Sequence, residues 1–152
     1  MARPHETALD AVQVVGGALL VGALLVPWTS EGPASSIDAH RVGALLASGV
    51  LDSLVPRWGA ILIYAGPLGG ALAVVAVGLH SAARRWCERV AAALVLVTLV
   101  PASVLALTGP PGGGVVLTML GGLAVLVSVV VSALLERRRP RPNGALTDPA
   151  VP

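Results

Sequence analysis

Residues 27–58 read PWTSEGPASSIDAHRVGALLASGVLDSLVPRW and form the only long polar interruption in an otherwise apolar chain. A tryptophan stands near each end of the stretch, at Trp28 and Trp58. Indole rings concentrate at membrane–water interfaces, with the ring in lipid and the N–H group in water. We therefore interpret this stretch as a segment outside the membrane that joins two membrane-spanning helices.

The composition of the whole chain also indicates a membrane protein. Hydrophobic residues make up 55% of the 152 residues and charged residues 12%, and the mean hydropathy is +0.85. Soluble domains carry about 25% charged residues. A chain this apolar needs the bilayer as its solvent, and apolar runs of about 20 residues without alternation predict helices.

Four such runs predict an all-α fold, a bundle of four transmembrane helices. We expect these helices at about residues 9–28, 58–80, 89–108 and 114–135. Residues 29–57 form the outer loop in this interpretation, and residues 1–136 form a single membrane domain. Residues 137–152 are rich in Arg and Pro, which predicts a disordered cytoplasmic tail. The first run is long for the apolar part of a signal peptide, so we expect it to be retained.

The distribution of arginine predicts the orientation. All ten basic residues are Arg, and basic residues near helix ends favour the cytoplasmic side. With four helices, the termini and the middle turn share one side, which holds eight arginines: Arg3, Arg84, Arg85, Arg89, Arg137, Arg138, Arg139 and Arg141. The other side holds Arg41 and Arg57. We therefore expect a multi-pass protein of the plasma membrane with both termini in the cytoplasm.

Within the outer segment, residues 37–55 have the pattern of an amphipathic helix. Ser35 and Ser36 are candidate N-caps, and Asp38 follows in the first turn. At about 100° per residue, polar side chains gather on one side of this helix. The apolar side holds Val42, Leu46, Val50 and Leu54. We expect the helix to lie in the outer interface, with this apolar side in contact with the bundle or with a partner.

Small residues recur four apart in the expected membrane helices, a spacing that lets helix backbones approach closely. The candidate packing residues are Ala18, Gly22, Gly66, Gly70, Gly114, Thr118 and Gly122. Pro67 and Pro101 predict kinks, because proline has no amide donor for its helix.

We expect no catalytic residues, no cofactor and no metal ion. His5, His40 and His80 lie in separate segments without the spacing of metal ligands. Acidic, histidine and serine side chains coincide only in the outer segment, and their order matches no catalytic signature. The single cysteine, Cys87, excludes an intramolecular disulfide. Membrane topology already explains the arginine clusters, so nucleic-acid binding is not indicated.

The layout resembles the small four-helix membrane proteins of actinobacteria. The shared features are a first helix that ends in Pro27 and Trp28, a polar loop with Ile-Asp-Ala-His-Arg at residues 37–41, three further helices and an Arg/Pro tail. The resemblance implies a location in the cell envelope. It implies no activity and no functional residue.

We expect a non-enzymatic protein that acts by association. It would serve as an accessory subunit or a self-assembling component of an envelope complex, with the bilayer and a membrane protein or a second copy as partners. The alternative is a small transporter or an oligomeric pore, in which helices bend at Pro67 and Pro101 around a path. A membrane enzyme of unknown type is the third hypothesis.

Overall fold

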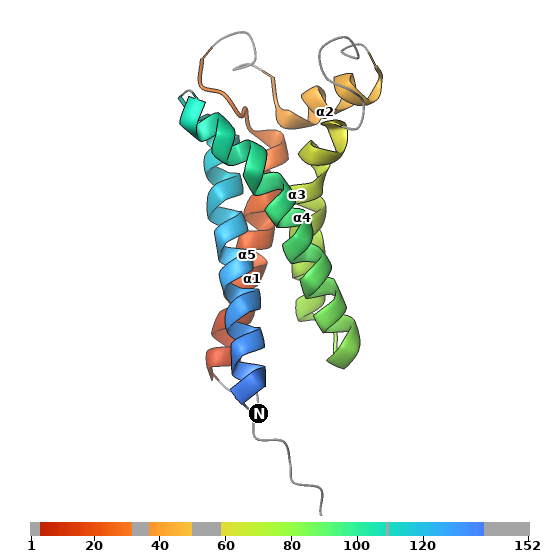
Figure 1. Ribbon diagram of the computed structural model, residues 1–152, viewed down its shortest axis with the longest axis vertical. Coiled ribbons are helices and arrows are strands. Elements are labelled where there is room, and N and C mark those ends of the chain that lie inside the picture. Colours follow the sequence, from red (N-terminus) through yellow and green to blue (C-terminus); the bar gives the residue numbers. More distant parts are fainter. Residues whose placement is uncertain (1–3, 32–36, 50–58, 109, 139–152) are drawn as a thin grey trace, which may run out of the picture.

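The computed structural model describes residues 4–31, 37–49, 59–108 and 110–138 (Figure 1). Within these ranges the chain is all-helical, as the sequence predicts. The elements are α1 (Pro4–Gly22), a short 3-10 helix η1 (Ala23–Leu25), α2 (Ala39–Ala47), α3 (Gly59–Val77), α4 (Ser81–Thr108) and α5 (Gly113–Arg138). Several residues of the sequence predictions lie outside these ranges: Ser35, Ser36, Val50, Leu54, Trp58 and the tail from residue 139 onward.

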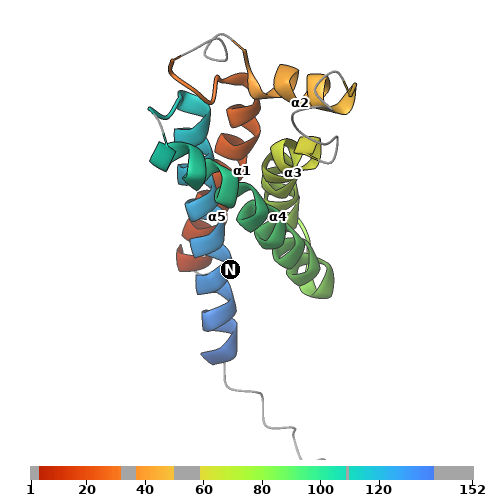
Figure 2. The same cartoon turned by 45° about the horizontal axis from the view of Figure 1, so that its top comes forward.

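The four long helices lie alongside one another. Helix α1 contacts both α3 and α5, and α4 packs mainly on α3 and also on α5. The start of α1, the turn between α3 and α4 and the end of α5 lie at one end of the molecule (Figure 1). Helix α2 lies at the opposite end, across the end of α3 (Figure 2).

Among the described residues, three helical segments are long and apolar enough to cross a membrane: Thr7–Leu25, Ala82–Leu107 and Gly113–Arg137. The apolar part of α3, Ile61–Val77, is shorter. Large apolar side chains lie on the outside of the helices, and Leu107 is 86% exposed. In water such a surface would drive aggregation, whereas lipid covers it without cost. These features define a helical membrane protein.

Three ends of the long helices lie more than three residues from the sequence prediction, and the first is the start of α1, at Pro4 instead of residue 9. Helix α4 begins at Ser81, eight residues before the expected start at residue 89, because the basic stretch contains strong helix formers. Helix α1 ends at Gly22, and η1 follows it. Val26 is then extended, with φ −120° and ψ 141°. It precedes Pro27, and a residue before proline avoids the helical region.

Helix α2 is shorter than predicted. We expected it over residues 37–55, but it ends at Ala47. Gly49 has a φ of 78°, a left-handed conformation that glycine adopts at helix ends. At the other end Asp38 is the N-cap, since its Oδ1 accepts a hydrogen bond of 2.8 Å from the backbone N–H of Arg41.

Pairs of consecutive glycines bring the helices together. Gly17 of α1 faces Gly70 of α3, and a Cβ atom on either one would lie within 2.6 Å of the other's carbonyl oxygen. Gly16, the preceding residue, faces Gly121 of α5. A Cβ atom on Gly16 would lie 2.9 Å from the Gly121 oxygen, and one on Gly121 would lie 2.7 Å from the Gly16 oxygen. Consecutive helix positions point about 100° apart. One glycine pair on α1 therefore lets two neighbouring helices approach its backbone.

The same device recurs on α3 and α5. Gly70 faces α1, whereas Gly69 lies against Ala91 of α4. On α5, Gly121 faces α1 and Gly122 lies against Leu99 of α4. Helix α4 has no consecutive glycines and presents small or branched side chains instead, all fully buried: Ala91, Val95, Thr98 and Ala102.

The predicted pair Ala18 and Gly22 does not make the close contact of α1. Ala18 is exposed, and a Cβ atom on Gly22 would meet nothing within 4 Å. Gly66 and Gly70 both lie at helix contacts, but Gly66 meets Thr98 of α4 and Gly70 meets α1. Small residues four positions apart lie on one face of a helix and so suit a helix with one neighbour. Each helix here packs against two neighbours, so small residues are needed on two faces.

These contacts predict that Gly70→Ala destabilises the protein. The new Cβ atom would lie 2.6 Å from the backbone oxygen of Gly17, which has no side chain to move aside. We expect a loss of about 1–3 kcal/mol, measured by thermal unfolding of the purified protein in mild detergent. Gly22→Ala is the matched control, and its stability should be unchanged or slightly raised. Equal melting temperatures for both variants would contradict the close approach of α1 and α3.

Candidate functional site

An ion triad joins α1 to the first turns of α4 at the end of the bundle that carries the termini. The Arg84 Nη2 atom lies 2.6 Å from Asp10 Oδ1, and its Nε atom lies 2.8 Å from Glu88 Oε1. The side chains of Arg84 and Asp10 are each 28% exposed, and that of Glu88 is 11% exposed. One guanidinium therefore pairs with two partly buried carboxylates on two helices, which leaves the triad with one excess negative charge.

The sequence contains a signal for half of this triad. Arg84 and Glu88 are four residues apart, the spacing at which opposite charges pair on a helix. The sequence analysis places residues 80–89 in a turn, where a four-residue spacing does not predict an ion pair. Asp10 carries no comparable signal, because it lies 74 residues from Arg84 and the sequence does not show that the two side chains meet.

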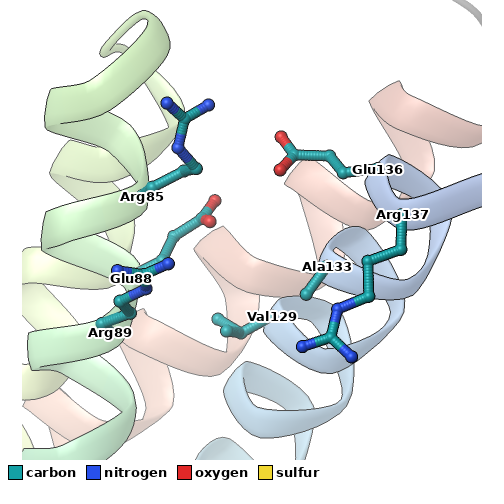
Figure 3. A pocket seen from close by; sticks show the side chains of 7 residues that line it. All are labelled: Arg85, Glu88, Arg89, Val129, Ala133, Glu136 and Arg137. Carbon is teal, nitrogen blue, oxygen red and sulfur yellow. The ribbon is translucent and has the colours of Figure 1, made fainter. Parts of the chain in front are cut away.

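A cleft opens beside the triad, between α4 and α5 (Figure 3). Its volume is about 410 Å³. Five charged side chains from the two helices line the cleft: Arg85, Glu88, Arg89, Glu136 and Arg137. Two apolar residues of α5, Val129 and Ala133, complete the lining. Arg85 and Glu88 extend from α4 toward the space between the helices, and Glu136 extends toward it from α5 (Figure 3).

The arginines of this cleft carry uncompensated charge. Arg84 forms the ion pairs with Asp10 and Glu88, and the remaining ion pair in the described ranges joins Arg41 to Asp38 at the other end of the molecule. Arg85, Arg89 and Arg137 thus have no carboxylate within 4.0 Å among the residues that the structure describes. The cleft can therefore attract an anion.

At the opposite end, α2 is seated on α3. Ala39 is buried, and a Cβ atom on Gly43 would lie 2.8 Å from the ring of Tyr64. The Tyr64 O–H donates to the backbone oxygen of His40 over 3.3 Å. The rings of Tyr64 and His40 pack edge to face, with their centroids 6.2 Å apart. Val42, from the predicted contact face, is half-buried.

Leu46 belongs to α2, but its side chain is outside the described set, as are Val50 and Leu54. Val42 is therefore the one member of the predicted contact face whose side chain the structure describes. Ala39 and Gly43, which make the seat on Tyr64, are small residues and carry little hydrophobic signal.

The predicted stripe of Gly114, Thr118 and Gly122 is buried, but its members meet different neighbours. Gly114 lies against the indole ring of Trp28, and its N–H donates to Pro27 O over 2.9 Å. The Thr118 hydroxyl donates to Gly114 O over 2.8 Å. Gly122 meets α4. This stripe joins α5 to the Pro-Trp segment at one end and to α4 further along.

Trp28 organises the end of the bundle that carries α2 through its main chain and its ring. Gly112 N–H donates to the Trp28 carbonyl over 2.9 Å, and the indole N–H donates to Ala23 O over 3.0 Å. We predicted an indole N–H in water, whereas the structure gives it a backbone acceptor at the end of the first helix. The predicted interfacial residue thus holds η1, the turn before α5 and Gly114 together.

Polar side chains inside the helices are used to hold the chain together. The hydroxyl groups of Thr98, Ser103 and Ser128 donate to carbonyls three or four residues earlier in their own helices. Gln13 is fully buried, and its Nε2 donates to Ala73 O of α3 over 2.9 Å. In the described part of the chain, no group of three His, Cys, Asp or Glu side chains is placed to hold a metal ion.

Comparisons of the chain with models of protein families, with curated proteins and with solved structures gave no match. The resemblance to small actinobacterial membrane proteins therefore stays a prediction.

The triad predicts a strong coupling between Asp10 and Arg84. Arg84→Gln should destabilise the protein by roughly 1–3 kcal/mol, because it leaves two carboxylates without their cation. In the double variant with Asp10→Asn the loss should be clearly smaller than the sum of the two single losses. Thermal unfolding in detergent measures all four proteins, with Arg85→Gln as the neighbouring control. Additive effects would show that the 2.6 Å contact contributes nothing.

Proposed function

We propose that the chain is a multi-pass protein of the plasma membrane in which α1, α3, α4 and α5 span the bilayer. Both termini lie in the cytoplasm in this arrangement, and α2 lies at the outer surface. Arg84, Arg85, Arg89 and Arg137 at the end with the termini support this orientation, against Arg41 on α2. Basic residues flanking spanning helices favour the cytoplasmic side.

The length of α3 is compatible with a fourth span. Its apolar part, Ile61–Val77, has 17 residues, at the lower end of the range for transmembrane helices. At 1.5 Å per residue this part covers about 25 Å, against a hydrocarbon core of about 30 Å. Close packing on α1 and α4 shields one side of α3, and a local thinning of the bilayer compensates for the remainder.

The position of α2 supports an interfacial helix. It lies across the end of α3 rather than along the bundle (Figure 2). Its nine residues are too few to span a bilayer. Ala39 and Gly43 face the bundle, while His40 and Arg41 are exposed, as an interfacial helix requires.

We infer that the protein is non-enzymatic and acts by association through the outward side of α4. Only 22% of the apolar window of α4 is buried, against 39% for α5. Val100 and Val104 are among the exposed side chains of α4. The hydroxyl groups of four residues donate within their own helices, so they do not indicate a polar path through the bundle: Thr98, Ser103, Thr118 and Ser128. This observation favours an accessory subunit or a self-assembling component of a membrane complex.

One observation favours a small transporter as the second candidate. Pro67 and Pro101 interrupt the hydrogen bonds of two helices that pack against each other, and Gly66 meets Thr98 at this contact. Paired breaks of this kind occur where transporter helices bend. However, the Thr98 hydroxyl donates to Leu94 O in its own helix, which leaves it a poor lining group for a polar path.

The orientation predicts the accessibility of Cys87, the single cysteine of the chain. A membrane-impermeant maleimide should leave Cys87 unlabelled in intact cells and label it after permeabilisation, because the start of α4 faces the cytoplasm. In the variant Cys87→Ala with Glu31→Cys, the label should react in intact cells, since Glu31 is exposed at the opposite end. Labelling of Cys87 in intact cells would reverse the proposed orientation.

The association hypothesis predicts that the native protein purifies in mild detergent as an oligomer or with a membrane-protein partner. Val100→Ala with Val104→Ala on α4 should weaken this assembly. The matched control is Val127→Ala with Val130→Ala on α5, where both side chains are similarly exposed. Light scattering and protein identification on the purified material measure the result. A lone monomer, or solute flux in proteoliposomes that hold this chain alone, would contradict association.

A further inference from the structure

The cleft between α4 and α5 is lined by charged side chains from both helices. We propose that it holds the phosphodiester of an anionic phospholipid from the leaflet at the end with the termini. This inference rests on the proposed membrane placement of the helices. It adds a ligand to a part of the molecule that the proposed association does not use.

The charge of the cleft selects an anion. Of its two carboxylates, Glu88 is already bound by Arg84 at 2.8 Å. Arg84 also pairs with Asp10, so the cleft and the ion triad together hold four guanidinium groups against three carboxylates, which leaves an excess of one positive charge. Guanidinium groups bind phosphate oxygens in pairs of parallel hydrogen bonds, and they lose less solvation than ammonium groups when they do so.

The geometry presents these charges from both walls. Arg85 and Arg89 are one helical turn apart on α4, and Arg137 stands on α5 across the space (Figure 3). A phosphate in the cleft therefore meets cations from two helices, which a single basic helix face does not offer. A volume of about 410 Å³ lies within the range of small-ligand sites.

The floor of the cleft favours a lipid over a free phosphate ion. Val129 and Ala133 form this floor, and Val129 packs directly on the buried core of the bundle. Charged walls above an apolar floor match a head group and the start of its acyl chains. Trp86, next to Arg85, is 66% exposed, as expected for an indole at the level of lipid head groups.

The fold keeps the cleft open. Helices α4 and α5 are close at the end near Gly113 and diverge toward the other end (Figures 1 and 2). The bond between Arg84 and Asp10 ties the beginning of α4 to α1. The first turns of α4 are thus fixed in position relative to the bundle, and the space between them and the last turns of α5 opens at this end of the molecule.

Native mass spectrometry of the full-length protein in mild detergent tests this site. Dioleoylphosphatidylglycerol should bind and dioleoylphosphatidylcholine, which has the same chains and no net charge, should bind far more weakly. Arg89→Gln with Arg137→Gln should lower the affinity for phosphatidylglycerol about tenfold or more. Arg41→Gln, at the other end of the molecule, is the matched control and should have no effect.

A second variant gives an effect of opposite sign and avoids loss of folding. Glu136→Gln removes the unpaired carboxylate from the exposed rim, so the affinity for phosphatidylglycerol should rise. Equal binding of both lipids, or no change in either arginine or glutamate variant, would overturn the site. Displacement of the lipid by low millimolar inorganic phosphate would show a simple anion site and overturn the lipid assignment. The measurement in detergent is independent of the orientation that Cys87 labelling reports, so each can fail alone.

Discussion

The bundle depends on the close approach of three helix backbones, and consecutive glycines permit it. Helix–helix association in lipid gains little from the hydrophobic effect, because lipid tails are as apolar as the side chains. Van der Waals contact between backbones supplies the attraction instead. Gly16 with Gly17, Gly69 with Gly70 and Gly121 with Gly122 each open two sides of a helix. As a result α1 fits between α3 and α5, while α4 is held by α3 and α5 through small side chains.

The two ends of the bundle are stabilised by different chemistry. At the end with α2, backbone hydrogen bonds and the Trp28 ring join the first helix to the start of α5. At the other end, Arg84 and its two carboxylates join α1 to α4. The first arrangement is compact and apolar, and the second leaves α4 and α5 apart with charged side chains between them. The asymmetry gives the protein one end where the helices are joined closely and one end where a cleft separates α4 from α5.

The sequence predicted the class of fold because that depends on composition and the length of apolar runs. The bounds of α3 and α5 lie within three residues of the expected ones, since glycine, proline and charge mark their ends. The packing residues were harder, because the four-residue rule selected Ala18 and Gly22 and passed over Gly16 and Gly17. That rule describes a helix with one neighbour.

The remaining differences have local causes. Gly49 adopts a left-handed conformation beyond the end of α2, which apolar periodicity does not register. The stretch before residue 89 was read as a turn from its charge, although its residues favour helix, and so the triad and the cleft were missed. The triad and the cleft both depend on which helices become neighbours. Local sequence patterns do not show which helices pack together.

Gln13 adds a constraint that glycine contacts lack. Smooth backbone surfaces allow one helix to slide or rotate against another with little change in energy. One turn from the contact of Gly17 with Gly70, the Gln13 side chain donates to Ala73 O in the middle of apolar surroundings. A shift of α1 by one residue would break this bond and leave the amide nitrogen without an acceptor. The axial register of α1 and α3 is thus set by a neutral group, and it is insensitive to pH and to ionic strength.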